Sequence, residues 1–556
     1  MLPYSGRLRC SFLKPDPDSA VASGRWGAIL TRMQSTRSAR KSTAPMDFRT
    51  LPLVAALSLC ATGFASPLQD TSAAAPAQED PTTVGFQLTL EQAVKIALDN
   101  NIGLRIEVFQ EEIQLYTHLG SWGAFDPLAT ISGTYTDSEQ PASTSLSGAS
   151  VVESDTLALQ AGFMYPLRSG GSFDLGYSHS NSSTNSIFAL DDTLTDSAVS
   201  LSYTQPLLRG AWSGYNTVEQ QKAELRWRQS QQRHREVRVD LVHSVVQAYW
   251  DLVAALEGHA VQQETVELGR RQLEQNKHRL EVGVGTEVEV LQAETNVATQ
   301  LEVLLQTETN ALTADDALKT LLFARAESDN WEQWYAWWDH AVDPMTTLPE
   351  VDEDLPLDWI ASLGAALQSR PELDQRRIDI QIAEFDIMKA GSEERAGLDL
   401  TLSVRSTGVD GQSDEAVKTA TSFEFPTASA GLTYSAPLYN RAAENALRSA
   451  RVGLRSARLV YEQTETGILT EIRAAVRGVR HQAQAVRAAG VSYDLAKRQL
   501  EAENSRFEQG LSTNFQVLEY QQQLSQAKAN LVASRVRYAK ARTALVKAEG
   551  RLDQEL

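Results

Sequence analysis

The longest stretch with a regular pattern of apolar and polar residues has the spacing of an α-helix. Between Thr217 and Val282 there is no proline, and apolar residues recur at alternating steps of four and three. They are Leu241, Val245, Ala248, Leu252 and Ala255. This seam is typical of a coiled coil, and a helix of that length would extend roughly 100 Å at 1.5 Å per residue. An alanine-rich stretch from Ala443 to Gln509 predicts a second helix of the same kind.

Shorter segments alternate with a period of two residues, which predicts strands. In each segment, apolar residues alternate with small polar ones over a few positions. The segments are 129–135, 199–203, 398–404 and 430–434. An apolar outer face and a small polar inner face are what a lipid-embedded, water-lined barrel requires. Four strands are too few to close a barrel, so this pattern predicts an oligomer.

A further alternating pair, 156–165 and 172–178, leaves two interpretations open. It is either an additional barrel hairpin or an extension of strands outside the membrane. The Ser/Thr/Asn-rich runs 138–150 and 179–195 are expected to be surface loops. The predicted fold is therefore a mixed α and β membrane protein. Its β-barrel, with four strands per chain or six if the extra pair takes part, continues into a long α-helical coiled-coil barrel.

Three pairs of similar segments occur in the same order along the chain, which predicts a duplicated unit. The pairs are 97–104 with 366–373, 201–207 with 432–438, and 279–286 with 506–513. We place the first repeat at 88–325 and the second at 357–553, each built from a helix, strands and a long helical hairpin. The linker 326–356 contains Trp331, Trp334, Trp337 and Trp338. These tryptophans favour a packed collar beside the tunnel over a ligand cage, because no polar groups converge with them.

The first 65 residues have the features of a targeting segment. The run 51–59 is almost wholly apolar, Arg49 precedes it, and small residues allow cleavage after Ala65. We interpret 1–65 as an upstream extension plus a signal peptide, with Met33 or Met46 as the true start. Residues 66–87 are expected to be a flexible lead-in. No later stretch approaches about 18 consecutive apolar residues, so we expect any membrane crossing to be made by the strands of a β-barrel.

Charge and cysteine content exclude several functions. The formal net charge is −20, which argues against a nucleic-acid partner. Cys10 and Cys60 both lie in the leader, so disulfides and thiolate metal sites are not expected in the mature chain. Lipidation of Cys60 is the competing interpretation, but Leu59 stands where a lipoprotein signal needs a small residue. No catalytic motif is present, and no cofactor or metal is expected.

The long helices are expected to reverse at two glycine-containing breaks. Gly283 and Gly510 interrupt the helical pattern, and Thr286 and Thr513 can cap the helices that follow. The glycines at 283 and 285 do not indicate a nucleotide-binding loop, because neither a third glycine nor a P-loop lysine follows.

Nearly the whole mature chain resembles the TolC family of outer-membrane efflux proteins. The segments that carry the resemblance are Leu88–Asn101, Gly123–Pro127 (GAFDP), Gln205–Gly210 (QPLLRG) and the paired breaks. The resemblance implies a homotrimer in outer-membrane lipid, with a twelve-stranded barrel and a helical tunnel through the periplasm. It also implies two partners, a periplasmic adaptor protein and an inner-membrane pump or ABC exporter, the latter for type I secretion.

The same resemblance assigns two groups of site residues. The adaptor-docking tips would be Val282, Gly283, Val284, Gly285, Thr286, Gly510, Leu511, Ser512 and Thr513. The pore-gate candidates are Glu289, Gln292, Gln516 and Glu519. Gln516 departs from the acidic residue that relatives carry, which weakens a double cation site. The alternatives are a hairpin turn without a partner and solvated helix-surface charges.

The predicted function is passive, gated export of solutes or proteins, driven by the partner pump. The rival interpretation is a structural coiled-coil envelope protein or adhesin, which would need neither barrel strands nor chain reversals. The sequence does not identify the exported substrate.

Overall fold

The computed structural model describes residues 86–141, 150–185, 193–323, 335, 338–352 and 357–552. The signal segment with Cys10 and Cys60, almost all of the lead-in, and Trp331, Trp334 and Trp337 lie outside these ranges. The expectations made for them stay predictions. All described residues fall within one compact unit.

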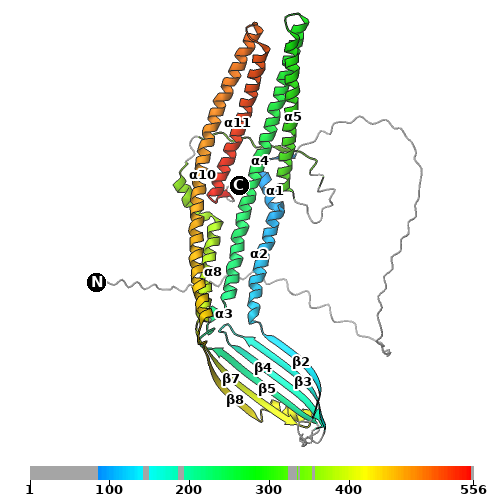
Figure 1. The fold of residues 1–556 in the computed structure, drawn as a ribbon, viewed down its shortest axis with the longest axis vertical. Coiled ribbons are helices and arrows are strands. Elements are labelled where there is room, and N and C mark those ends of the chain that lie inside the picture. Colours follow the sequence, from blue (N-terminus) through cyan, green and yellow to red (C-terminus); the bar gives the residue numbers. More distant parts are fainter. Residues whose placement is uncertain are drawn as a thin grey trace, which may run out of the picture. The chain divides into compact units, whose positions relative to one another are not determined.

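The helices follow the predicted duplication. Each half begins with two consecutive helices, and each ends with a very long helix followed by a shorter one (Figure 1). The first half contains α1 (Leu90–Asn100), α2 (Ile102–Ser121), the short η1 (Trp122–Phe125) and α3 (Ser213–Asn216), α4 (Val218–Glu281) and α5 (Glu287–Leu322). The second contains α7 (Trp359–Ser369), α8 (Pro371–Glu393), α9 (Ser413–Ser422), α10 (Arg441–Glu508) and α11 (Asn514–Ala548). The two long helices lie within two residues of their predicted limits.

The strands form a six-stranded antiparallel sheet in the order β2-β3-β4-β5-β7-β8. They are β2 (Leu128–Pro141), β3 (Val151–Pro166), β4 (Ser172–Thr184), β5 (Thr193–Pro206), β7 (Gly397–Asp410) and β8 (Pro426–Ser435). A separate short parallel pair joins β1 (Phe86–Leu88) to β6 (Val342–Pro344). The segments left open by the sequence are β3 and β4, and they lie inside the sheet.

Of the two strand counts left open by the sequence, the sheet has the larger, with β2 to β5 from the first half and β7 and β8 from the second. One expectation about the strands is corrected. The expected loops are shorter, because β2 continues to Pro141, β4 continues to Thr184, and β5 already begins at Thr193. Threonine favours strands, and cross-strand pairing offsets the weak preference of serine and asparagine for them.

The sheet exposes its apolar face. Leu175 and Leu201 are cross-strand partners on this face, and they are 48% and 50% exposed. Residues of the opposite face, such as Asp174 and Gly176 on β4, are less exposed. A soluble sheet has the reverse arrangement, with apolar side chains against the core. Within this chain, nothing that the structure describes covers the greater part of the apolar face.

Helix α9 covers the apolar face only at the end of the sheet far from the long helices. Thr195, Ser197 and Ser406 are fully buried beneath it. A Cβ atom on Gly408 would lie 2.1 Å from the Ala416 carbonyl oxygen, so only glycine allows this close contact. The other side of α9 carries charged residues, and the apolar band therefore ends where α9 begins.

The main hydrophobic core lies around the middle of α4, where α1, the end of α5, α11 and the β1–β6 pair meet. At its centre the buried Tyr249 hydroxyl donates to the Leu88 carbonyl oxygen at 3.0 Å and accepts from the Thr346 N–H at 3.0 Å. Buried Lys319 forms an ion pair with Asp315 at 2.5 Å. None of the described helices carries an apolar run suited to crossing a membrane.

The Tyr249 hydroxyl gives the first prediction. Tyr249→Phe would leave the part-buried Thr346 N–H without its acceptor, and the Leu88 carbonyl would keep only its second donor, the Met345 N–H. Loss of such a partner costs about 1–3 kcal/mol. We expect a lower midpoint in thermal denaturation followed by circular dichroism. Tyr439→Phe is the matched control, because Tyr439 is largely exposed. Equal midpoints for the two variants would contradict the proposed role of the Tyr249 hydroxyl.

Candidate channel wall and helical tips

Both long hairpins turn by the same backbone motif. Gly283 and Gly510 have φ values of 78° and 75°, in the left-handed region that glycine adopts without strain. At the first tip the Gly283 N–H donates to the Leu280 carbonyl and the Val284 N–H to the Arg279 carbonyl. The second tip repeats both bonds in equivalent positions. These are the two hydrogen bonds of a Schellman motif, so the predicted chain reversals are confirmed.

The next helices start with matching capping boxes. The Thr286 hydroxyl accepts from the Glu289 N–H, and the Glu289 carboxylate accepts from the Thr286 N–H at 3.0 Å. Thr513 and Gln516 form the same reciprocal pair at the start of α11. A capping box accepts either Glu or Gln at its last position. The Glu-to-Gln difference at Gln516, unexpected for a gate residue, is thus compatible with the local fold.

The remaining gate candidates lie one turn further along. Gln292 and Glu519 are both exposed. The Glu519 carboxylate accepts a hydrogen bond from Gln523 at 3.3 Å. Within the single chain, the tips place Glu289 with Gln292 on α5 and Gln516 with Glu519 on α11. No described contact joins these two pairs into one cluster.

A polar network that the sequence did not reveal links the two hairpins near their tips. Gln272 and Asn276 on α4 and Asn514 on α11 are all buried. The Gln272 side chain donates to Asn514 Oδ1 at 3.1 Å, and Asn276 donates to the Glu289 carbonyl oxygen at 3.2 Å. Further from the tips, the hydroxyl groups of Thr265 and Ser525 form a hydrogen bond at 2.7 Å, and Lys528 forms an ion pair with Glu264. Polar pairs therefore hold α4 against α11 along much of their length.

Large apolar side chains stand exposed at the tips. At the first tip Val284 is 67% exposed and Val282 is also exposed. At the second tip Leu511 is 66% exposed. The next turns add Val288, Leu291 and Phe515 to this set. Their density exceeds that of isolated surface hydrophobics and is typical of an interaction site.

A second exposed apolar row runs along α2. Its members follow steps of four and three, which is the spacing of a coiled-coil seam. They are Ile102, Ile106, Phe109, Ile113 and Tyr116. The other side of α2 packs on α4, where Leu104 is buried and Glu111 pairs with His234 at 2.9 Å. The exposed row is therefore a helix-packing seam that no described part of the chain covers.

The junction between sheet and helices joins the two repeats. Lys222 on α4 pairs with Asp386 on α8 at 2.7 Å, and Lys389 on α8 pairs with Glu219 on α4 at 2.8 Å. The hydrogen bond from Lys389 lowers the pKa of the Glu219 carboxyl. Beside them, Gly210 has a φ of 80° and its carbonyl accepts from Asn216 at 2.7 Å, which turns the chain from β5 into α4.

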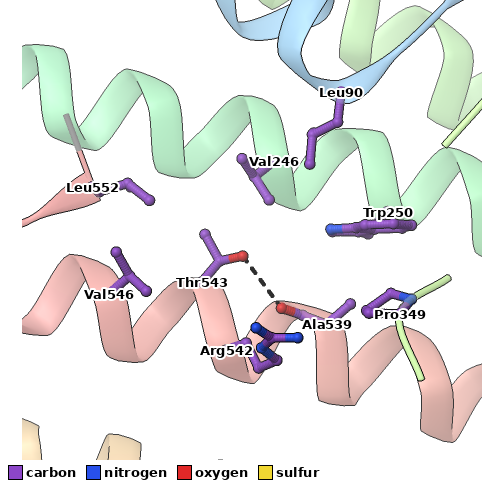
Figure 2. Close-up of a pocket in the computed structure, with 9 residues that line it drawn as sticks. All are labelled: Leu90, Val246, Trp250, Pro349, Ala539, Arg542, Thr543, Val546 and Leu552. Carbon is purple, nitrogen blue, oxygen red and sulfur yellow. Dashed lines mark hydrogen bonds between the residues drawn. The ribbon is translucent and has the colours of Figure 1, made fainter. Parts of the chain in front are cut away.

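One hollow among the described residues lacks the groups that catalysis needs. Figure 2 shows a hollow between α4, α11 and the start of α1, lined mainly by apolar residues such as Val246, Trp250 and Leu552. Arg542 is its one charged residue, and a lone guanidinium supplies neither a nucleophile nor a general base. Among the described residues no three His, Cys, Asp or Glu side chains gather as a metal site would require.

The capping boxes generate the second prediction. Thr286→Ala or Thr513→Ala removes one reciprocal cap, which costs about 1 kcal/mol. We expect hydrogen exchange of the first turn of α5 or α11 to become roughly fivefold faster. Gln516→Glu should leave exchange unchanged, because Glu also completes the box. Thr309→Ala, at an exposed site within α5, is the control. Equal exchange at the tips of Thr286→Ala and Thr309→Ala would contradict the capping role.

Comparison with known proteins agrees with this architecture. A sequence profile described as outer membrane efflux protein matches residues 133–322 and 363–551. No match is found among curated protein sequences. The fold is similar to the CmeC outer membrane channel of Campylobacter jejuni, with a TM-score of 0.62, 17% identity, and coverage of 88% of this chain and 94% of that one.

Two other solved structures have a similar fold. One is a membrane protein from Pseudomonas aeruginosa, with a TM-score of 0.61, 19% identity, and coverage of 87% and 98%. The other is VceC from Vibrio cholerae, with a TM-score of 0.59, 15% identity, and coverage of 83% and 96%. The chain belongs to the outer membrane efflux protein family, whose TolC-like members are outer-membrane channels rather than enzymes and extend their helices into the periplasm.

Proposed function

We propose that the chain is one subunit of a homotrimeric conduit that passes solutes out of the cell through the periplasm and the outer membrane. The observation that carries the proposal is the sheet with an exposed apolar face, joined directly to two helical hairpins. Lipid would cover the apolar face, and the hairpins would form the wall of the periplasmic tunnel. The energy would come from a partner pump.

Ring closure is supported by the position of the unpartnered surfaces. On one side of the subunit, α2 with its exposed seam leads into edge strand β2. On the other side, edge strand β8 leads into α10, which exposes Val452 and Leu459. On each side of the subunit, the outer helix and the edge strand are thus neighbouring segments of the chain. A neighbouring copy could complete both layers at once, as a closed ring requires.

The exposed apolar tips support docking of a periplasmic adaptor. Val282 to Thr286 and Gly510 to Thr513 form rigid turns, because Schellman motifs and capping boxes fix their backbones. Rigid apolar knobs lose little conformational entropy on binding. An inner-membrane pump or an ABC exporter of a type I secretion system would join through the adaptor.

The gate is proposed at Glu289, Gln292, Gln516 and Glu519. In a three-fold ring, each position would repeat three times around the axis. Glu519 is the better candidate for a charged ring, because the residue is exposed and its carboxylate contacts, among the described residues, only the Gln523 side chain, while that of Glu289 is engaged in the capping box. A structural coiled-coil adhesin is the second candidate function, favoured only by the length of the helices.

Conductance tests the proposal. Trimers purified from the outer membrane and reconstituted in a planar bilayer should give discrete conductance steps. Absence of steps under every opening condition, with correctly inserted trimers, would refute the channel.

Glu519→Gln should reduce cation preference more than Glu289→Gln, measured as reversal potential in a salt gradient. Glu302→Gln, an exposed site further along α5, is the control for charge.

The α2 seam gives a separate prediction about assembly. Phe109 is 55% exposed in the single chain but would be buried between copies. Phe109→Glu would place a charge in that contact, and we expect heat-modifiable trimers to be lost on gel electrophoresis. Phe109→Leu keeps an apolar side chain at the seam and should retain them. Trimers of normal stability with Phe109→Glu would show that α2 faces solvent.

A further inference from the structure

We propose that three copies close a barrel of eighteen strands, six from each, in place of the twelve that the TolC resemblance implies. The inference rests on the proposed homotrimer and concerns the width of its membrane-spanning part. Its origin is the β3–β4 hairpin, which lies between β2 and β5 in the sheet.

Pairing shows that the hairpin is part of the sheet along its whole length. Every residue of β2 from Leu128 to Pro141 has a partner in β3. Likewise β4 pairs with β5 from Ser172 to Ser183. Within the described residues β2 and β5 have no direct pairing with each other. Removing the hairpin from the barrel would leave both strands with unpaired backbone groups, which a bilayer does not tolerate.

The faces of the hairpin match those of the other strands. One row of partners runs Phe163, Leu175, Leu201 and Val404 across β3, β4, β5 and β7. The apolar face of the hairpin is thus continuous with that of β5 and β7, and its side chains are exposed to a similar extent. A hairpin outside the membrane would have no reason to expose such a face to water.

Strand direction permits closure with six strands per copy. All neighbours in the sheet are antiparallel, so the first strand β2 and the sixth strand β8 run in opposite directions. In a ring, β8 of one copy therefore meets β2 of the next in antiparallel orientation. Both edge strands are almost wholly exposed in the single chain. Antiparallel pairing throughout is the rule for outer-membrane barrels.

The extra strands widen the lumen. With strands about 4.8 Å apart and tilted by about 40°, the backbone diameter is about 24 Å for twelve strands and about 36 Å for eighteen. The inner face carries many small side chains, among them Thr130, Ser202 and Ser403, and a few larger ones such as Met164 and Arg405. A barrel of this size is water-filled, so bulky hydrated solutes would pass through it without being selected by contacts with its wall. The narrowest point would then lie in the helical tunnel.

Cryo-electron microscopy of purified trimers in lipid nanodiscs counts the strands directly. We expect eighteen strands in one closed barrel, with β8 of each copy paired to β2 of its neighbour. A trimeric tunnel whose barrel has twelve strands, with β3 and β4 outside it, would overturn this inference and leave the proposed function intact. Particles without a trimeric tunnel would overturn the proposed function itself.

A pair of substitutions on the apolar face provides a second measurement. Leu175 on β4 and Leu201 on β5 are cross-strand partners in the same row, and each is replaced by arginine in a separate variant, Leu175→Arg and Leu201→Arg. If both strands face lipid, each should reduce heat-modifiable trimers in the outer-membrane fraction severalfold. The control is Ser202→Arg, on the inner face opposite Asp174, which should have little effect. Loss with Leu201→Arg but normal trimers with Leu175→Arg would place the hairpin outside the membrane and refute the inference.

Discussion

Unpaired backbone groups along β2 and β8 are the constraint on which the assembly depends. Each edge strand has hydrogen-bonding groups on one side that no described strand satisfies, and the exposed apolar face suits a lipid environment. In a bilayer no water is available to satisfy such edges, so only a closed barrel removes them. The single chain has too few strands to close on itself, and the subunit is therefore incomplete as a membrane protein.

The helices meet the same constraint in a different form. A very long helix is stable only when its apolar seam is packed. Within the chain, α4 is packed by α5, α11 and α2, and the core around Tyr249 fixes its middle. The seam of α2 remains open, on the same side of the subunit as β2. In the proposed ring, strand pairing and helix packing between copies would thus be geometrically coupled, and one contact would stabilise the other.

The features that sequence predicted well are those encoded locally. Helix limits follow from heptad spacing, and the turns at Gly283 and Gly510 follow from glycine and threonine in adjacent positions. The strand count was harder, because Ser- and Thr-rich strands resemble loops in composition. The network of Gln272, Asn276 and Asn514 could not be predicted, since Asn514 is far in sequence from the other two residues and only the packing of α4 on α11 brings it to them.

At the tips, the capping of the helices and the proposed gate involve the same residues. Glu289 and Gln516 occupy the last position of a capping box, which either side chain can complete. Capping therefore constrains hydrogen-bonding ability at these positions but not charge. Charge at position 289 or 516 is therefore free to vary while the turn is preserved. Glu519 has no such capping role, so the turn does not account for an acidic residue there, whereas the proposed gate would.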